Sequence, residues 1–274
     1  MASPFYPPYV NIVTARGMQP VIMEAGPETR FQPSVAMLEK LDPKPDGLIV
    51  ASPCNPVGTM LHPDELAAIA RWCHTNGVRL VSDEIYHGLN YESPIATAAS
   101  FSDSAIVVNS FSKYFSMTGW RIGWTIGPAE VIKAMDNLQS QETSNPCSIS
   151  QYAAVEALNG PQESVEAMRV EFEKRRDYVM ERMLPWRSKF GITFAEPSGA
   201  FYAFFNIKAH LGRQYGGVQV NDSAQWCLEL LAQKGVACVM GSAFGAEGYA
   251  RMSFATSLDV LAKGFDQIEA FLKS

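Results

Sequence analysis

Short runs of aliphatic and β-branched residues, each followed directly by polar residues, limit the fold of this chain more than any other feature. They cover residues 47–51, 78–82 and 105–108. Between the first and second runs lies a helix pattern, with Pro63 in its first turn and Gly77 at its end. Strands that alternate with helices form parallel sheets covered by helices. We therefore predict an α/β fold with a mostly parallel sheet flanked by helices.

The rest of the chain continues with helix patterns before its character changes. Helix patterns occupy 128–141, 148–183 with a break at Gly160-Pro161, 223–234 and 259–272. Strand patterns occupy 192–205, where two strands surround a turn, 236–240 and 250–255, and residues 210–217 are typical of a mobile connection. Regular strand–helix repeats give way to a mixed pattern, which places a boundary near residue 170. We expect a large domain at 1–170 and a smaller α+β domain at 171–274.

Lys113 follows the third apolar run, at the point where a strand ends. Ser110 and Ser112 precede it, and Arg121 follows in the same segment. In open α/β sheets, ligands bind at the carboxyl ends of the strands. An amine can condense with an aldehyde, and hydroxyls with a guanidinium can bind a phosphate. The segment is therefore typical of a site for a phosphorylated aldehyde cofactor, although a loop lysine can also be a solvated charge.

Asp83 follows the second apolar run, and Tyr86 comes shortly after it. If the cofactor is pyridoxal 5'-phosphate, a carboxylate is needed beside the pyridine nitrogen, because the ring withdraws electrons best when that nitrogen is protonated. Asp83 suits this role, and the phenol of Tyr86 can donate to the ring oxygen. Asp83 could instead cap a following helix. A metal site at Asp83, Glu84 and His87 is disfavoured, because no second His or Cys pair has ligand spacing nearby.

Asn55 lies between two prolines in the turn that follows the first apolar run. A carboxamide held in this way can donate to a cofactor ring oxygen, to a substrate carboxylate, or to both. The alternative is an ordinary turn in which the Asn side chain bonds to nearby backbone.

Four segments occur in the order and approximate spacing found in one family of enzymes. They are S-P-x-N-P-x-G around Asn55, S-D-E-I-Y around Asp83, S-x-S-K-x-x-x-M-x-G-W-R-x-G around Lys113, and a late arginine at Arg251. From about Pro4 to its C-terminus, the chain resembles class I and II aminotransferases, the fold-type I pyridoxal-phosphate enzymes of the aspartate and aromatic kind. The resemblance implies an enzyme that moves an amino group between an L-amino acid and a 2-oxo acid.

The resemblance also assigns the ligands of pyridoxal 5'-phosphate. Lys113 matches the lysine that condenses with the aldehyde and then moves a proton as general base and acid. Asp83 matches the partner of the pyridine nitrogen. The remaining ligands are Asn55 and Tyr86 at the ring oxygen, Ser110, Ser112 and Arg121 at the phosphate, and Tyr6 stacked on the ring.

Arg251 matches the arginine that pairs with the substrate carboxylate. In an alternating strand it shares a face with Ser253 and Ala255, opposite Met252 and Phe254. A guanidinium can hold a carboxylate through two parallel hydrogen bonds, which a lysine does less well. By spacing alone, Arg251 could instead be a solvated arginine on a strand.

The chain departs from the family at its start, which lies close to Tyr6. Complete enzymes of this family carry an N-terminal arm, early strands and a glycine-rich phosphate-binding loop before this point. We therefore expect a fragment or an N-terminally truncated product of a homodimeric enzyme, without the tyrosine that one subunit offers its neighbour. In the family, the preference for a particular substrate side chain depends on those N-terminal parts. Candidate residues for an apolar pocket in this chain are Phe201, Tyr202, Trp124 and Met117, which could instead belong to the core.

Composition agrees with a cytoplasmic enzyme. A net charge of -6 and the lack of a basic run argue against nucleic acid as a partner. The five cysteines are widely scattered, which favours reduced thiols over a disulfide framework. No apolar run is long enough to span a bilayer, so no membrane partner is expected. With 274 residues and 47% hydrophobic content, the chain can bury a large core.

The sequence leaves alternative functions open. A C–S β-lyase of the same fold would share the cofactor ligands. An aminotransferase-like effector domain of a transcription regulator would carry a basic DNA-binding segment upstream, and none is visible in this chain. An inactive fragment would fail to hold the cofactor.

Overall fold

The computed structural model describes residues 1–91 and 94–274 and divides into two compact units. The sheet unit comprises Pro33–Pro53 and Met60–Val170. The C-terminal unit comprises Met1–Gln32, Cys54–Thr59 and Glu171–Ser274. The units are interleaved along the chain, and a division into domains at 1–170 and 171–274 stays a prediction.

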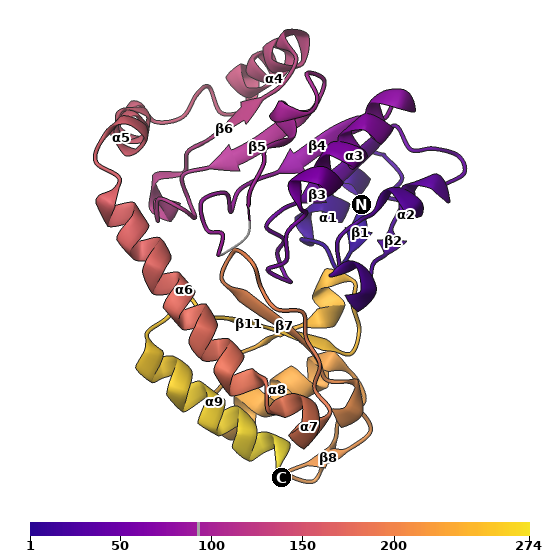
Figure 1. Cartoon of the computed structure of the whole chain (residues 1–274), viewed down its shortest axis with the longest axis vertical. Helices are drawn as coiled ribbons and strands as arrows, with labels where there is room; N and C mark the ends of the chain where they lie inside the picture. The colour runs from indigo at the N-terminus through magenta and orange to yellow at the C-terminus, as the bar shows by residue number, and fades with distance from the viewer. Residues whose placement is uncertain (92–93) are drawn as a thin grey trace. The chain divides into compact units, whose positions relative to one another are not determined.

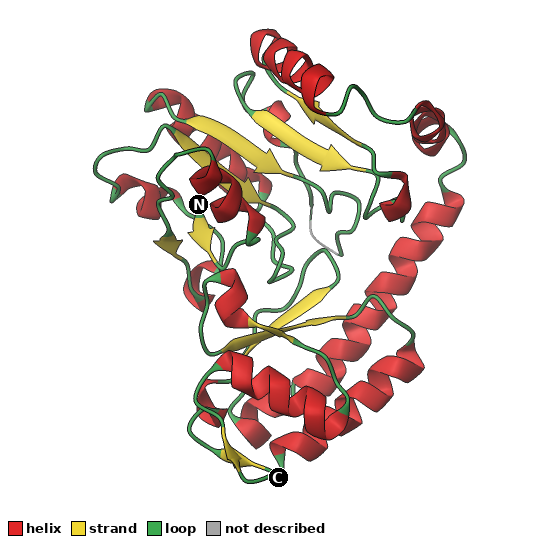
Figure 2. Cartoon of the chain, turned by 180° about the vertical axis from the view of Figure 1, so that it is seen from behind, coloured by secondary structure: helices red, strands yellow, loops and turns green. Residues whose placement is uncertain are grey.

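The sheet unit is built on a four-stranded sheet (Figures 1 and 2). Its strands, in spatial order, are β3 (Gly47–Ala51), β4 (Arg79–Asp83), β5 (Ile106–Ser110) and β6 (Gly123–Ile126). β3, β4 and β5 are parallel, and β6 runs antiparallel to β5. The predicted α/β fold with a mostly parallel sheet is therefore confirmed.

β6 has no counterpart in the sequence prediction. It is only 4 residues long and starts at a glycine, so it lacks the long apolar run that marks the other strands. It forms because the chain folds back after β5 and Gly123 pairs with Ser110. A Cβ at Gly123 would lie 2.6 Å from the carbonyl oxygen of Asn109, so the absence of a side chain permits this close approach.

The predicted helices form to within a few residues of their expected ranges, whereas some shorter helices were not predicted. The helices of the sheet unit are α3 (Pro63–Thr75), α4 (Ala129–Glu142), α5 (Ser148–Asn159) and the unpredicted α2 (Val35–Glu39), with 3-10 turns at Ala98–Ser100 and Thr118–Trp120. The boundary between the units falls inside α6 (Glu163–Met183). Within residues 1–91 and 94–274, no helix is both long and apolar enough to cross a membrane.

α3 shows why the predicted helices form. Pro63 occupies its first turn, and the Glu65 carboxylate accepts the backbone N–H of His62 at 2.8 Å. Its buried face contains the apolar stripe expected from helical spacing: Leu66, Ile69, Ala70 and Cys73. The helix thus satisfies its first turn locally and gains its stability from tertiary burial of one face.

The C-terminal unit has an antiparallel sheet in the order β10 (Val239–Met240), β11 (Tyr249–Ser253) and β7 (Tyr202–Asn206). Its helices are α1 (Pro8–Ala15), α7 (Trp186–Phe190), α8 (Ser223–Lys234) and α9 (Leu258–Leu272), and its short elements are β1 (Ala2–Ser3), β2 (Met23–Glu24), β8 (Gln214–Tyr215), β9 (Val218–Gln219) and 3-10 turns at Pro27–Thr29, Lys208–His210 and Gly241–Phe244. The sequence predicts two strands within 192–205. β7 forms there, whereas Phe194 makes a single bridge to Phe205.

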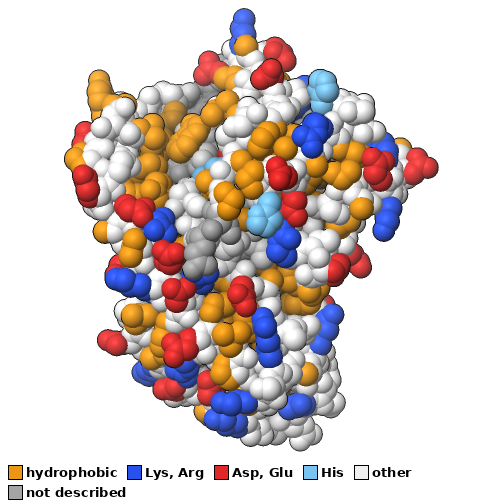
Figure 3. Space-filling view, in the orientation of Figure 1, with side chains coloured by type: hydrophobic (Ala, Val, Ile, Leu, Met, Phe, Trp, Pro, Cys, Tyr) orange, Lys and Arg blue, Asp and Glu red, His pale blue; other side chains and the backbone are white. Residues whose placement is uncertain are grey.

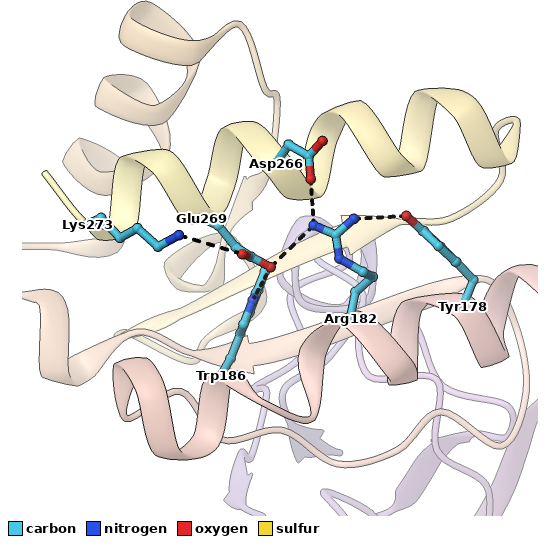
Figure 4. Close-up of polar contacts among 6 residues, drawn as sticks. All are labelled: Tyr178, Arg182, Trp186, Asp266, Glu269 and Lys273. Carbon is cyan, nitrogen blue, oxygen red and sulfur yellow. Dashed lines mark hydrogen bonds and ion pairs between the residues drawn. The ribbon is translucent and has the colours of Figure 1, made fainter.

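α6 and α9 are joined by a polar network centred on Arg182 (Figure 4). The Arg182 guanidinium donates to Asp266 Oδ1 at 2.8 Å, to Glu269 Oε1 at 3.3 Å and to Tyr178 Oη at 2.9 Å. The indole of Trp186, which is completely buried, donates to the same Glu269 oxygen at 3.2 Å. The network therefore satisfies a buried indole N–H and holds two helices of the C-terminal unit together.

The mobility predicted for residues 210–217 stays a prediction. β8 and β9 form an antiparallel hairpin across residues 214–219, which the sequence did not predict. His210 and Tyr215 are buried, with His210 Nδ1 2.6 Å from Tyr215 Oη and His210 Nε2 2.8 Å from the carbonyl oxygen of Phe190. These two hydrogen bonds join the start of the segment to the hairpin and to the residue that ends α7.

We expect the stability of the fold to decrease as the pH falls below the ordinary histidine pKa of 6.5. Burial lowers the pKa of His210, with a smaller effect of Arg213 in the same direction, while the Phe190 carbonyl opposes the shift. The unfolded chain therefore takes up a proton that the folded chain resists. For one group, this reduces the free energy of unfolding by at most about 1.4 kcal/mol per pH unit. Urea unfolding across a pH series from about 8 to about 5 measures the slope.

The matched variant is His210→Gln, because glutamine keeps a donor and an acceptor but takes up no proton. Its stability should depend less on pH than that of the wild-type protein. Burial also lowers the pKa of His87, so part of the slope should remain in the variant. Identical slopes in the two proteins would contradict the role assigned to His210.

Candidate active site

The carboxyl ends of β3, β4 and β5 lie at one edge of the sheet unit, because these strands are parallel. Asp83 is the last residue of β4, and Ser110 is the last residue of β5. Asp83 is partly buried, and its Oδ1 accepts the backbone N–H of Ile85 at 3.1 Å. Its carboxylate is therefore held at the strand end by the turn that follows, rather than by capping a regular helix.

Tyr86 and Lys113 come from successive strand–loop segments and meet at this edge. The phenol ring of Tyr86 is buried, and Lys113 Nζ lies 5.8 Å from the ring centroid. The two segments also contact through Gly88, where an added Cβ would lie 2.5 Å from the ring of Tyr114. Gly88 has a φ of 93°, so glycine suits both the turn and the close approach.

The loop after β5 presents two hydroxyls side by side. Ser110 Oγ lies 3.0 Å from Ser112 Oγ, 3.0 Å from the carbonyl oxygen of Ile122 and 3.1 Å from the backbone N–H of Ser112, which it accepts. Arg121 is exposed on the same loop, and its guanidinium donates to the Thr118 carbonyl at 3.0 Å. Hydroxyls and a guanidinium are kinds of donor that suit a phosphate, and all three side chains belong to the segment at 110–121.

Arg121 adopts the left-handed backbone conformation, with φ 52° and ψ 50°. This conformation costs a residue with a side chain roughly 1–2 kcal/mol. Strained residues of this kind concentrate at functional sites, where surrounding contacts hold them in place. The backbone of Arg121 thus agrees with a binding role for its side chain.

Glu84 and His87 support the turn that carries Tyr86. Glu84 is buried, and its carboxylate accepts from Ser82 Oγ at 2.9 Å and from the backbone N–H of Ala98 at 2.8 Å. Its second oxygen lies 3.3 Å from His87 Nδ1. Burial lowers the pKa of His87, and the carboxylate of Glu84 opposes that shift. In the part of the chain that the structure describes, no group of His, Cys, Asp and Glu side chains is arranged to hold a metal ion.

The C-terminal unit brings Asn55 and Arg251 together. The guanidinium of Arg251 donates through Nη1 to Asn55 Oδ1 at 2.8 Å. The bond directs the amide oxygen of Asn55 toward Arg251, so the NH₂ group is the part of this amide that can donate to an anionic oxygen. Along β11, Met252 is buried while Arg251 and Ser253 are less so, which agrees with the predicted alternation.

The loop that carries Asn55 is held in place through the backbone of Gly58. Its carbonyl oxygen accepts the backbone N–H groups of Ser198 at 2.9 Å and Gly199 at 2.8 Å. Its φ is 80°, and an added Cβ would lie 2.6 Å from the Cβ of Pro197. Glycine is therefore required at this position, where two chain segments approach each other closely.

The remaining predicted site residue, Tyr6, is 42% exposed. Its ring packs edge-on against Tyr9, with 5.6 Å between centroids. The backbone N–H of the preceding residue, Phe5, donates to the carbonyl oxygen of Phe244 at 3.0 Å. This bond attaches the segment of Tyr6 to the turn that contains Phe244.

The predicted site residues fall into two groups. The sheet unit holds Asp83, Tyr86, Ser110, Ser112, Lys113 and Arg121, and the C-terminal unit holds Tyr6, Asn55 and Arg251. The sequence did not point to Phe244, which lies beside the Arg251 guanidinium, because no local pattern joins these residues. Tyr202, left open as pocket or core, also contacts Arg251, whereas Phe201 stacks on Phe172. The roles of all these residues stay predictions.

A mostly parallel sheet with a lysine, a carboxylate and paired hydroxyls at its carboxyl edge defines the class of pyridoxal-phosphate-dependent transferases of fold type I. Within that class, the chain belongs to the family of class I and II aminotransferases, whose model matches residues 1–268. The expected family and fold are both confirmed by this match and by the solved structures that the chain resembles.

Similar proteins include enzymes with different named substrates. The valine–pyruvate aminotransferase of Mycobacterium tuberculosis is 41% identical, and the alignment covers 100% of this chain and 69% of that protein. The aspartate aminotransferase of Geobacillus stearothermophilus is 37% identical, with coverage of 99% and 69%. The chain thus spans about 69% of the length of these relatives.

Solved structures show the same relationship. The crystal structure of an aminotransferase from Mycobacterium tuberculosis has a TM-score of 0.91 and 39% identity, and covers 100% of this chain and 69% of that one. The aspartate aminotransferase from Rhizobium meliloti has a TM-score of 0.92 and 33% identity, with coverage of 99% and 69%. The agreement extends along essentially the whole of this chain.

The family implies pyridoxal 5'-phosphate as cofactor, and the residues present fit this group. Ser110 and Ser112, with hydroxyl oxygens 3.0 Å apart, and the strained, exposed Arg121 supply donors and positive charge for its phosphate. The partly buried carboxylate of Asp83 suits a protonated ring nitrogen. The amine of Lys113 supplies the nucleophile that an aldehyde requires.

Proposed function

We propose that this chain is a pyridoxal-phosphate-dependent aminotransferase of aspartate or aromatic type, which moves an amino group between an L-amino acid and a 2-oxo acid. The observation that carries the proposal is the common location of Asp83, Ser110 and Lys113 at one edge of one sheet. A carboxylate, a phosphate-binding hydroxyl and an amine at that edge supply a partner for each end of the cofactor and for its aldehyde.

When bound, the cofactor supplies an electron sink for the bonding electrons released at the substrate Cα. The chain has to keep the ring nitrogen protonated for this purpose. We assign that task to Asp83, whose negative charge favours the proton on the nitrogen. We assign to Tyr86 the donation of its phenol hydrogen to the ring oxygen, which would stabilise negative charge there.

Proton transfer is the task of Lys113. With the cofactor bound, its amine would serve as the base that takes the proton from the substrate Cα and as the acid that gives it up again. The nearby Tyr86 ring, 5.8 Å from Nζ, restricts the positions open to this flexible side chain. Positioning of this kind makes the transfer effectively intramolecular, which lowers its barrier.

Arg251 is assigned to the substrate carboxylate, with Asn55 as its supporting partner. A guanidinium binds a carboxylate through two parallel hydrogen bonds and thereby orients the amino acid. The 2.8 Å hydrogen bond to Asn55 fixes one end of that guanidinium. Orientation is required, because the bond broken at Cα has to lie perpendicular to the cofactor ring.

The names of similar proteins support two amino-group donors. Aspartate appears among the named substrates of several relatives, while the relative that is 41% identical is named for valine and pyruvate. We therefore take aspartate as the first candidate donor and valine, paired with pyruvate, as the second. An aromatic amino acid is the third amino-group donor to compare, because the family that the sequence resembles includes aminotransferases of the aromatic kind.

The test is an assay of the purified chain with pyridoxal phosphate. We expect 2-oxo acid to form from aspartate, valine or phenylalanine only when an acceptor 2-oxo acid is present. Release of pyruvate and ammonia from cystathionine without an acceptor would instead identify a C–S β-lyase. If the chain binds no cofactor, as judged by absorbance after gel filtration, the proposal fails.

We also propose that the chain assembles as a homodimer. On α5, four apolar side chains are exposed: Ile149 by 69%, Tyr152 by 80%, Val155 by 58% and Leu158 by 56%. Exposed apolar surfaces of this kind are typical of protein interfaces. On the face drawn in Figure 3, acidic and basic side chains are interspersed, so no extended basic surface for nucleic acid is visible there.

Light scattering should give twice the mass of one chain, and Tyr152→Glu should shift the protein toward the monomer. A charge buried in an apolar interface destabilises it strongly, because the carboxylate loses its hydration. Gln151→Glu, an exposed change on the same helix, serves as the control. A monomeric wild-type protein would refute this assembly.

A further inference from the structure

Tyr202 and Phe244 place their rings against the guanidinium of Arg251. We infer that these two side chains are positioning residues, which orient Arg251 for binding the substrate carboxylate. The inference rests on the proposed function, because it concerns how Arg251 is held for the role assigned to it above.

Both rings lie within cation–π distance of Arg251. The guanidinium carbon is 4.4 Å from the ring centroid of Tyr202 and 4.9 Å from that of Phe244. Such contacts attract the cation through the negative face of the ring, most strongly when water is excluded. Tyr202 and Phe244 are both buried, so the attraction acts largely outside water.

The sheet of the C-terminal unit determines why Tyr202 meets Arg251. In the antiparallel pair of β11 and β7, Arg251 is opposite Phe204, and Ser253 is opposite Tyr202. Opposite residues share a face, and diagonal neighbours on that face are within reach of long side chains. Tyr202 is therefore the diagonal neighbour of Arg251, and a shift of register would separate them.

Phe244 is fixed by an aromatic cluster. It ends the 3-10 turn Gly241–Phe244, and its ring packs edge-on against Phe204 with 6.2 Å between centroids. Phe204 in turn stacks on Tyr249 with 5.0 Å between centroids. The position of the Phe244 ring is thus set by the core of the unit rather than by Arg251.

Two rings and one hydrogen bond together restrict the guanidinium. The rings limit where its plane can lie, and the 2.8 Å bond to Asn55 Oδ1 limits its rotation within that plane. Each of these three partners is neutral, so none of them cancels the positive charge. An N–H group bonds to a ring face only weakly compared with the charge-assisted bond that a carboxylate accepts, so these contacts leave the guanidinium able to bind a carboxylate.

The functional consequence is preorganisation. Arginine has a long side chain with many rotamers, and ordering it during binding weakens affinity. If Tyr202 and Phe244 order Arg251 in advance, a carboxylate ligand gains the two-bonded geometry without that loss. The rings should therefore influence substrate affinity more than the rate of the chemical step.

The test removes each ring while it keeps the buried volume. We expect Tyr202→Met and Phe244→Met each to raise the KM for the amino acid by about tenfold, with kcat changed by less than about twofold. Tyr202→Phe retains the ring face and should recover most of the lost affinity. In an Arg251→Leu background, Tyr202→Met should have no further effect on KM, because the cation is gone.

Binding without turnover gives a second readout. Calorimetric titration of the pyridoxal-phosphate-loaded protein with succinate, an unreactive dicarboxylate, should show a parallel rise in Kd for both Met variants. Phe271→Met removes a buried ring that stacks on Tyr215 in the same unit, and it controls for loss of stability. Thermal unfolding then shows whether the variants are folded to the same extent as this control.

The outcomes separate the two proposals. If Arg251→Leu weakens succinate binding but the Met variants bind succinate as the wild-type protein does, the positioning role is overturned and the proposed function stands. If Arg251→Leu leaves succinate binding unchanged, the carboxylate assignment itself fails. If Tyr202→Phe is as impaired as Tyr202→Met, the phenol hydroxyl rather than the ring face is responsible, which also overturns the inference.

Discussion

Lys113→Ala should abolish transamination while the protein still binds pyridoxal 5'-phosphate. The variant loses the amine that moves the substrate proton, and a positioned acid or base contributes up to about 10⁴-fold to a rate. Cofactor binding should persist, because the residues that we assign to the phosphate, Ser110, Ser112 and Arg121, remain in place. The measurement combines a transaminase assay with the absorbance of the cofactor that stays with the protein after gel filtration.

Two controls make this prediction specific to Lys113. Lys133→Ala changes an exposed lysine of α4 in the same unit and should leave the activity unaltered. Borohydride reduction of the wild-type protein should fix the cofactor on the peptide that contains Lys113. Wild-type turnover in Lys113→Ala, or a label on another lysine, would remove the central residue of the proposed function.

Asp83→Asn should lower kcat by about 10²–10³-fold, as expected when one electrostatic partner of the reacting system is lost. Asparagine has the shape of aspartate but no negative charge, so it no longer favours a proton on the pyridine nitrogen. The fold should survive, because the amide oxygen of Asn can still accept the backbone N–H of Ile85, which Asp83 accepts at 3.1 Å. Steady-state kinetics measure the fall in kcat, and thermal unfolding shows whether the fold survives.

Asp103→Asn is the matched control, since Asp103 is an exposed aspartate of the same unit just before β5. Its kinetics should equal those of the wild-type protein. If Asp83→Asn retains full turnover, another residue is the partner of the pyridine nitrogen. The role assigned to Asp83 at the carboxyl end of β4 would then be wrong.

Much of the sheet unit could be predicted, because its elements follow from local patterns. The apolar runs became β3, β4 and β5, and helical spacing identified both the extent of α3 and its buried face. β6 escaped prediction, since it depends on the return of the chain beside β5 and on the missing side chain of Gly123. The buried His210 was also missed, because its partners Phe190 and Tyr215 belong to tertiary structure.

The candidate site shows the same difference between local and long-range signals. Lys113, Asp83 and Ser110 could be placed at or just after strand ends from the sequence, because each lies within a few residues of the end of an apolar run. The hydrogen bond between Asn55 and Arg251 spans 196 positions of the chain, and no spacing rule reaches that far. The ring of Phe244 beside Arg251 is likewise a product of strand register and turn geometry.

The interleaving of the two units affects the order in which the protein can mature during synthesis. The C-terminal unit draws on Met1–Gln32, Cys54–Thr59 and Glu171–Ser274. Within this stretch of chain, Asn55 is synthesised well before the residues that supply β7 and β11. Its hydrogen bond to Arg251 can therefore form only after the residues of the sheet unit have been synthesised, so this contact belongs to a late stage of folding.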